Sequence, residues 1–463
     1  MTPEEFRLAG RQLVDLVADY LETVESRPVS APVKPGDVRA QLPEHPPTDP
    51  EHIDALIADL HDIVIPGLTH WQHPSFFGYF PANTSYPSIL ADLVTAGLGV
   101  QGMSWVTSPA ATEVETLMLD WVHELLGLPE RFHSESPNGG TVIQGSASEA
   151  TLVAVLSARH RAGVPAHQQV AYSTSQAHSS IEKDVRIAGL GHLRTVPHDL
   201  SFAMRAPALA ELVAADRAAG LTPSFVCSTH GTTSSLAFDP TPAIGDICAS
   251  EGMWLHVDAA MSGIAALADE HRWVNAGLDV ADSYVTDAHK WLGVGFDASL
   301  YWTADRASLL GALSILPEYL RSAAADSGAL DYRDWQIPLG RRFRALKLWF
   351  LLRLDGVESI KAMIRTQVGL TQELAGWVHE DGRFEVVAPH SLNLLCIALR
   401  DDDPDRANGR TEALIEAANA SGEALFTRTL LDGRTVLRFS IGSNRTGHEH
   451  VAKAWSLLQR LAA

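Results

Sequence analysis

The chain has 463 residues, of which 46% are hydrophobic and 20% charged, a composition typical of a globular protein with a substantial core. Its 56 acidic residues outnumber its 35 lysines and arginines, and the net charge of -21 disfavours binding to nucleic acid or to an anionic membrane surface. Its three cysteines have no paired spacing, so neither a disulfide framework nor a zinc cluster is predicted. Without a signal-peptide pattern or a long apolar stretch, the sequence predicts a cytoplasmic protein.

The N-terminal region predicts a helical arm followed by an extended strap. Thr2, Pro3 and Glu5 have the pattern of an N-cap, a first-turn proline and a capping-box acid, and apolar residues then recur at helical spacing. Residues 28–50 hold seven prolines, which favour an extended chain, and a second helix is expected from about residue 50 to 65 with Asp49 as its cap. An amphipathic arm without a compact partner often packs on another domain or on a second subunit.

Between about residues 140 and 305, short β-branched runs alternate with helical stretches, which is typical of an α/β fold with a mostly parallel sheet and helices on both faces. The expected strands are 141–144, 170–173, 193–196, 224–228, 254–257, 283–286 and 299–302. Beyond about residue 347 we expect a smaller α+β region with strands near 384–387, 393–398 and 435–440. Residues 97–102 match GxGxxG, but they follow a helical pattern rather than a strand, so a nucleotide site is disfavoured there.

Two charged residues end apolar strands of this predicted sheet. Lys290 follows the strand 283–286, and a buried lysine needs an ion pair, a lowered pKa or conversion to an imine, whereas an isolated lysine is more often simply exposed. Asp258 ends the strand 254–257, and a buried carboxylate needs a charged partner such as a protonated pyridine nitrogen, although an acid that caps a helix is the alternative. A metal site built from His256 and Asp258 is disfavoured because no third ligand is obvious.

Three further turns follow strands in the same way. Residues 145–148 form a turn of small residues before a helix, which could hold a phosphate on backbone N–H groups or simply cap the helix. His178 and the Gly-Thr-Thr turn that ends at Thr233 follow two other strands, and each taken singly is better explained as a polar loop residue. Because the ends of parallel strands meet at one edge of a sheet, all these residues are expected to converge there.

With these motifs, the chain resembles the group II amino-acid decarboxylases that depend on pyridoxal 5'-phosphate (PLP), and most specifically the aromatic L-amino-acid decarboxylases. The resemblance extends along the whole chain and is carried by THWQHPSFFGYFPANTSYP (69–87), SWVTSPAATEVE (104–115), VIQGSASEATLVA (142–154), QAHSS (176–180), FAMR (202–205), LHVDAA (255–260), HKWL (289–292) and WQIPLGRRFR (335–344). It implies a fold-type-I enzyme and a homodimer with active sites at the interface. The implied parts are a dimer-wrapping arm (1–85), a PLP-binding domain (86–347) and a small C-terminal α+β domain (348–463).

The resemblance also implies a role for each residue at the sheet edge. Lys290 bonds the cofactor, Asp258 pairs with its pyridine nitrogen, and His178 stacks on its ring. Thr233 supports the ring and His178, while Ala260 leaves room beneath the ring. The phosphate is held by Ser146, Ala147, Ser148 and His289. Asp287 stands where animal relatives carry asparagine, and a carboxylate beside a phosphate is unfavourable unless it is turned away or protonated.

The same resemblance also indicates the class of substrate and the type of reaction. Trp71, Tyr79, Phe80 and Pro81 match the wall of an aromatic pocket, Gln101 and Met103 replace bulkier apolar residues on the partner's side, and Gly340 favours an indole or a catechol. Tyr319, in a stretch that reads as a mobile loop, matches a tyrosine that delivers a proton to the substrate carbon. Relatives that oxidise their substrate carry phenylalanine at the loop position or asparagine at the ring-stacking position.

The function expected is therefore decarboxylation of an aromatic L-amino acid (tryptophan, 5-hydroxytryptophan, DOPA, tyrosine or phenylalanine) to its amine and CO2. The alternatives are an aromatic aldehyde synthase or a decarboxylase of a non-aromatic amino acid, such as glutamate or histidine, on the same scaffold. A non-catalytic binding protein is a remote alternative, because it predicts loss of Lys290 or Asp258 and both are present.

Overall fold

The computed structural model describes residues 1–315 and 329–462. Its first compact unit comprises Met1–Pro81, Glu373–Glu385 and Ile397–Ala463, and its second comprises Ala82–Gln372 and Val386–Cys396. The N-terminal segment and most of the C-terminal segment thus share a unit. The division expected at residues 85 and 347 stays a prediction.

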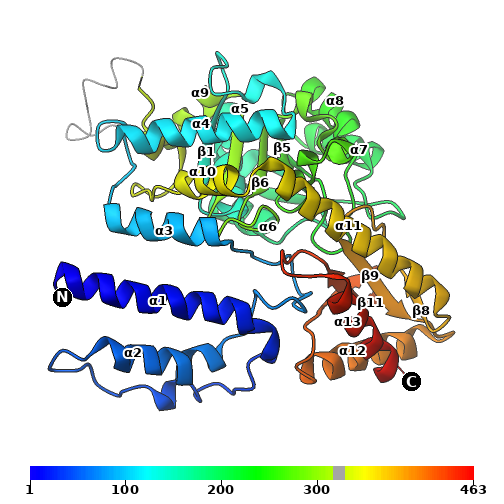
Figure 1. Cartoon of the computed structure of the whole chain (residues 1–463). Helices are drawn as coiled ribbons and strands as arrows, with labels where there is room; N and C mark the ends of the chain where they lie inside the picture. Colours follow the sequence, from blue (N-terminus) through cyan, green and yellow to red (C-terminus); the bar gives the residue numbers. More distant parts are fainter. Residues whose placement is uncertain (316–328, 463) are drawn as a thin grey trace. The chain divides into compact units, whose positions relative to one another are not determined.

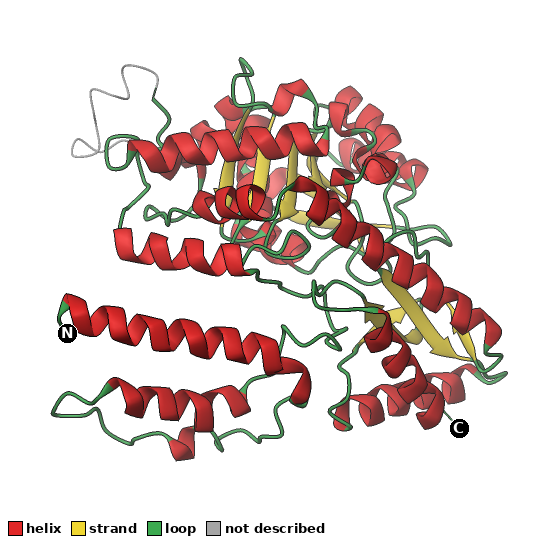
Figure 2. Cartoon of the chain, viewed as in Figure 1, coloured by secondary structure: helices red, strands yellow, loops and turns green. Residues whose placement is uncertain are grey.

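A seven-stranded sheet forms the centre of the second unit, with the strand order β1-β7-β6-β5-β4-β2-β3. The strands are β1 Gly140–Gln144, β2 Gln169–Thr174, β3 His192–Val196, β4 Thr222–Thr229, β5 Trp254–Asp258, β6 Ser283–Asp287 and β7 Ser299–Thr303. Each overlaps a stretch predicted from the sequence. All except β3 are almost entirely buried, because helices surround the sheet (Figure 2), and this explains their apolar, β-branched composition.

The direction of the strands decides where the sheet collects functional residues. Neighbours from β6 to β3 pair in parallel, whereas β7 runs antiparallel to both β6 and β1. Six strands therefore end at one edge, namely β1 to β6, of which β1, β5 and β6 are labelled in Figure 1. Because β7 is reversed, its first residue, Ser299, lies at this edge opposite Asp287.

The helices of this part of the chain are α3 Tyr86–Leu98, α4 Pro109–Leu126, α5 Ala147–Ala162, α6 Ser180–Ile187, α7 Ala206–Ala218, α8 Thr241–Glu251, α9 Arg306–Leu313, α10 Ala345–Leu354 and α11 Val357–Glu380. Serine side chains cap α3, α4 and α5, each accepting a hydrogen bond from a backbone N–H of the first turn. Gly99 then ends α3 in the left-handed conformation (φ 62°). The GxGxxG match is thus a helix end, as expected from its context.

The core beneath the sheet edge is built around α5. Its small and β-branched side chains, including Ala154 and Val155, pack in one buried cluster with strand residues such as Ala171, Phe225 and Trp254. Small residues on the helix allow it to approach the sheet closely. The N-terminus of α5, which follows β1 directly, is thereby fixed at the edge where the six strands end.

The first unit contains α1 Pro3–Thr23, α2 Ile53–Asp59, α12 Pro404–Ala420 and α13 His448–Leu461. The capping box predicted for α1 is present, since Thr2 and Glu5 bond each other's backbone N–H groups. The prediction for α2 was wrong at its start: the helix begins at Ile53 with His52 as its cap, not Asp49, and continues as a π turn over Leu60–Val64.

The small sheet has the order β10-β11-β9-β8, with β8 Phe384–Val386, β9 Leu394–Leu399, β10 Thr427–Leu431 and β11 Arg434–Ser440. Three of these strands were expected, whereas β10 was missed because it is a half-exposed edge strand with few apolar residues. Among the described residues, no helix combines the length and the apolar character that crossing a membrane requires.

One buried carboxylate makes the stability of the fold depend on pH. Asp184 on α6 is 3% exposed, and burial raises its pKa to about 7. Its stabilising contribution is complete below the pKa of the unfolded chain, near 3.8, and is lost as the pH rises through about 7. We expect Asp184→Asn to stabilise the protein at pH 8, by up to ~4 kcal/mol, and to change little at pH 4, as measured by urea unfolding.

Asp216 on α7 provides the matched control. Although burial raises its pKa, hydrogen bonds from Arg194 and Tyr172 outweigh this effect and hold the pKa below its usual range. Asp216→Asn is therefore expected to destabilise the protein at pH 8. A loss of stability at pH 8 in Asp184→Asn as well would contradict the prediction.

Candidate active site

The turn between β1 and α5 presents backbone N–H groups at the sheet edge. The hydroxyl of Ser146 accepts a hydrogen bond from Glu149 N (3.0 Å), while Gly145 N donates to the Glu149 carboxylate (2.8 Å). Ala147 and Ser148 occupy the first two positions of the helix, where amides lack acceptors within the helix itself. The helix dipole adds positive potential at the same point. The turn is therefore suited to an anion despite the net charge of the chain.

The loop after β2 and the turn after β4 are joined by hydrogen bonds. The Ser235 hydroxyl donates to Gln176 Oε1 (3.1 Å) and lies 2.8 Å from the hydroxyl of Thr232, the neighbour of Thr233. His178 Nδ1 accepts a hydrogen bond from Ser180 N (3.2 Å), which fixes the ring while leaving it exposed. Sequence reasoning missed Gln176 and Ser235, because neither polar residue is distinctive outside this network.

Asp258, at the end of β5, is 6% exposed and accepts a hydrogen bond from Ala260 N (3.0 Å). Burial raises its pKa, and the positive charge of Lys290 acts in the opposite direction. The charges of Asp287 and His178 also influence this pKa, so side chains from three strand ends are close enough to interact. The structure thus brings together residues that the sequence placed after separate strands.

Lys290 forms an ion pair with the buried aspartate three residues before it. Its Nζ lies 2.8 Å from Asp287 Oδ2, and Asp287 is 2% exposed. The other carboxylate oxygen, Oδ1, accepts a hydrogen bond from the Ser299 hydroxyl at the start of β7, and His289 Nε2 lies 3.6 Å from Oδ2. Burial acts to raise the pKa of Asp287, but Lys290 and His289 hold it below its usual value. Asp287 is therefore ionised and directed at Lys290.

The backbone around Lys290 is held by a residue far away in the sequence. The sequence indicated no role for Asn83, which is buried. Its backbone N–H donates to His289 O (3.2 Å), and its side-chain amide donates to Lys290 O (2.8 Å). Lys290 N also donates to Asp287 O (3.2 Å). These bonds fix the turn that carries the lysine, and sequence spacing contains no signal for them.

Two of the predicted substrate residues are neighbours in the second unit. Gln101 Oε1 accepts a hydrogen bond from Arg341 N (3.0 Å), and a Cβ added to Gly340 would lie 3.7 Å from Gln101 Nε2. Arg341 is itself buried in an ion pair with Glu115 (2.6 Å). The carbonyl of Met103 accepts a hydrogen bond from Arg333 N (2.9 Å), so the 101–103 segment is well anchored.

The aromatic segment belongs to the first unit. Trp71 and Tyr79 stack with ring centroids 5.5 Å apart and remain exposed, whereas Phe76 and Phe77 are fully buried and serve as core. Phe80, which precedes Pro81, lies 5.1 Å beneath the Arg438 guanidinium. Tyr319 lies outside the described residues.

His256 is not one of the predicted catalytic residues, and its contacts indicate a structural role. His256 lies 3.3 Å from the Thr151 hydroxyl and 2.9 Å from the Ser283 hydroxyl, and burial lowers its pKa to about 3, so it is a structural histidine.

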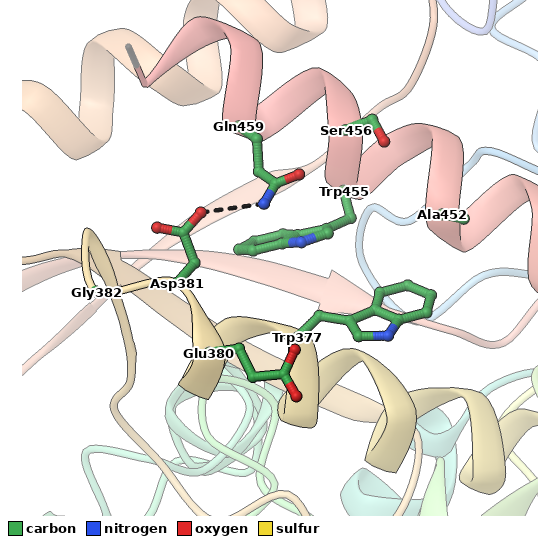
Figure 3. A pocket seen from close by; sticks show the side chains of 8 residues that line it. All are labelled: Trp377, Glu380, Asp381, Gly382, Ala452, Trp455, Ser456 and Gln459. Carbon is green, nitrogen blue, oxygen red and sulfur yellow. Dashed lines mark hydrogen bonds between the residues drawn. The ribbon is translucent and has the colours of Figure 1, made fainter.

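In the first unit, a shallow groove of about 500 Å³ lies between α11 and α13 (Figure 3). Within the groove, Asp381 accepts a hydrogen bond from Gln459 (3.1 Å).

Comparison with known proteins places this geometry in a family. Residues 35–400 match the family model described as the pyridoxal-dependent decarboxylase conserved domain. An aromatic-L-amino-acid decarboxylase of Bos taurus is 46% identical, and a phenylacetaldehyde synthase of Arabidopsis thaliana is 44% identical. Each alignment covers 100% of this chain and 97% of the relative.

Solved structures agree with this assignment. The structure of Oryza sativa TDC with PLP and tryptamine has a TM-score of 0.97 at 37% identity, covering 100% of this chain and 98% of the other. Catharanthus roseus tryptophan decarboxylase in complex with L-tryptophan has a TM-score of 0.95 at 36% identity, with the same coverage. The chain belongs to the pyridoxal-dependent decarboxylase family.

Proposed function

We propose that the protein decarboxylates an aromatic L-amino acid to the corresponding amine and CO2. The observation that carries the proposal is the convergence of Lys290, Asp258 and His178 at one sheet edge, in a chain whose full-length relatives include aromatic amino-acid decarboxylases. The charges of Lys290 and His178 both act on the Asp258 carboxylate, so the three groups share one site.

The residues at this edge fit PLP, the cofactor of the family. Burial raises the pKa of Asp258 because its charged form is costly in the interior. A protonated pyridine nitrogen would stabilise that charged form. The capped N-terminus of α5, with the amides of Ala147 and Ser148 beside the Ser146 hydroxyl, suits the phosphate, and His289 lies near the lysine. When bound, PLP supplies an electron sink for the pair released at the substrate Cα.

The chain's own groups orient the reaction. Asp258 would keep a proton on the pyridine nitrogen, which would strengthen electron withdrawal in the transition state. His178, whose Nδ1 is fixed by Ser180, would place its exposed ring against the cofactor ring, and Thr233 would support both from its turn. Ala260 would leave space beneath the ring. Lys290 would bond the cofactor between turnovers, and Tyr319 would deliver a proton to Cα.

We also propose a homodimer in which Gln101, Met103 and Gly340 of one subunit complete the pocket of the other. Exposed apolar side chains along α1 support this, since Phe6 is 59% exposed, Leu8 53% and Val14 48%. Trp71, Tyr79, Phe80 and Pro81 are the aromatic wall of the proposed pocket. Such a wall suits an indole or a phenyl ring better than a carboxylate side chain.

An aromatic aldehyde synthase is the second candidate, favoured by the 44% identity to the Arabidopsis thaliana enzyme. The sequence resemblance assigns asparagine at the ring-stacking position or phenylalanine at the loop position to such enzymes. This chain has His178 and Tyr319, which favour the decarboxylase.

A panel of L-amino acids tests both reaction and substrate. The purified holoenzyme is expected to release CO2 and amine in equal amounts from at least one of tryptophan, 5-hydroxytryptophan, DOPA, tyrosine and phenylalanine, without hydrogen peroxide. Glutamate and histidine serve as controls and are expected to react at least ~100-fold more slowly, because an aromatic wall offers no polar partner for a carboxylate or an imidazole. Equal amounts of aldehyde and peroxide would instead support the synthase.

Replacing Asp258 tests the electron-sink role. Asp258→Ala is expected to keep its fold and lose at least ~100-fold in kcat, because the pyridine nitrogen loses the carboxylate that holds its proton. Steady-state kinetics with the best substrate and circular dichroism measure the two effects. Asp258→Asn, which keeps the shape but not the charge, is expected to behave in the same way. Near-normal decarboxylation by either variant would refute the role.

Replacing Tyr319 tests the proton donor. Tyr319→Phe removes only the hydroxyl, so protonation of the substrate carbon becomes slower. The reaction of that carbon with molecular oxygen can then compete. We expect the product to shift from amine toward aldehyde with formation of hydrogen peroxide, measured by chromatography and a peroxidase assay. A variant that forms amine alone, at the wild-type ratio, would show that Tyr319 is not the donor.

A further inference from the structure

The ion pair between Asp287 and Lys290 has no place in the scheme above. Asp287 was a doubtful phosphate ligand in the sequence, and its carboxylate in fact faces the lysine, with Oδ2 2.8 Å from Nζ. The backbone N–H of Asp287 donates to Ala260 O (2.9 Å), which fixes its main chain, and the Ser299 hydroxyl donates to its carboxylate. It is 2% exposed, so water does not replace the lysine as its partner.

This arrangement has an energetic consequence for the lysine. A buried carboxylate stabilises Lys290 as a free ammonium group but gains less from a lysine whose nitrogen is bonded to the cofactor, since an imine nitrogen lacks the charge and the three N–H donors of the ammonium group. The other charged groups around it are Asp258 on β5, His289 beside it and His178 on the loop after β2. Asp258 is expected to pair with the cofactor ring, which leaves Asp287 as the counter-ion of the free lysine.

We propose that Asp287 is a positioning residue that receives Lys290 whenever the substrate displaces it from the cofactor. The inference rests on the role proposed above for Lys290. By holding the released ammonium group 2.8 Å from its carboxylate, Asp287 keeps the lysine close to the reaction but delays its return. It thereby favours the bond between cofactor and substrate over the bond between cofactor and lysine.

The exchange balances without an external reagent. The ammonium nitrogen of the substrate forms a C=N bond to the carbonyl-derived carbon of PLP, and the C=N bond between that carbon and Lys290 Nζ breaks. Three protons pass from the substrate nitrogen to Nζ, so Lys290 leaves as an ammonium ion and the total charge is unchanged. The ionised carboxylate of Asp287 stabilises this product side of the exchange.

The proposal predicts opposite shifts in two binding constants. Asp287→Asn keeps the shape of the side chain and its acceptor for Ser299, but it removes the charge that holds free Lys290. The apoenzyme is expected to bind PLP at least about tenfold more tightly, because no ion pair is broken. The holoenzyme is expected to bind tryptamine, which exchanges with the lysine but has no carboxylate to lose, at least about tenfold more weakly. Both constants are read from cofactor absorbance.

Two variants and one chemical test make the result decisive. Asp282→Asn removes a comparable carboxylate, paired with Arg161 at 2.6 Å just before β6, and is expected to leave both constants unchanged. Ser299→Ala loosens the Asp287 carboxylate and is expected to cause smaller shifts in the same directions as Asp287→Asn, should that variant fold poorly. Borohydride reduction followed by peptide mapping is expected to find PLP on Lys290. PLP on another lysine, or on none, would refute the role of Lys290 itself.

The remaining outcomes overturn the proposal about Asp287. Weaker binding of both PLP and tryptamine would mean that Asp287 only supports the fold. Tighter PLP binding with unchanged tryptamine binding would mean that its charge acts on the phosphate alone. Unchanged constants would mean that the ion pair has no influence on the exchange.

Discussion

The ion pair between the partly exposed ammonium group of Lys290 and the buried carboxylate of Asp287 is the interaction on which the site depends. Lys290 is paired with Asp287, and its charge also acts on Asp258, whose burial makes the charged form costly. None of these groups would be stable alone in the interior. Each therefore requires the sheet edge to place the others correctly, and the parallel strands do so by ending together. The capped N-terminus of α5 offers backbone dipoles in place of charged side chains, so the phosphate site proposed there would suit an anion even in an acidic chain.

Much of this arrangement could be predicted from the sequence. Buried strands have a strong apolar signal, and the rule that parallel strands end at one edge was enough to gather Ser146, His178, Asp258 and Lys290 in one place. The capping box of α1 was equally clear, because its pattern is local. Features set by neighbouring residues in the sequence, or by one topological rule, are thus readable without a structure.

Features that depend on side-chain direction were not readable. The sequence indicated that the Asp287 carboxylate is either turned away from a phosphate or protonated, but it could not say that the side chain turns to Lys290 and Ser299. Asn83 was missed because its partners, His289 and Lys290, lie more than two hundred residues away. The edge strand β10 was missed for a simpler reason: half its residues face solvent, so its apolar signal is weak.

The reversed strand β7 has a consequence for how this edge tolerates change. A crossover between parallel strands must span the sheet, and its length affects where the next strand begins. The β6 to β7 connection instead closes an antiparallel pair, in which the ladder itself sets Asp287 opposite Ser299. The 288–298 connection itself is mostly buried, and it is bonded to other parts of the second unit, since Trp291 Nε1 donates to Gln367 and Lys347 Nζ donates to Gly295 O. Residues added to this connection are therefore expected to disturb the turn that carries Lys290, even though the ladder holds Asp287 opposite Ser299.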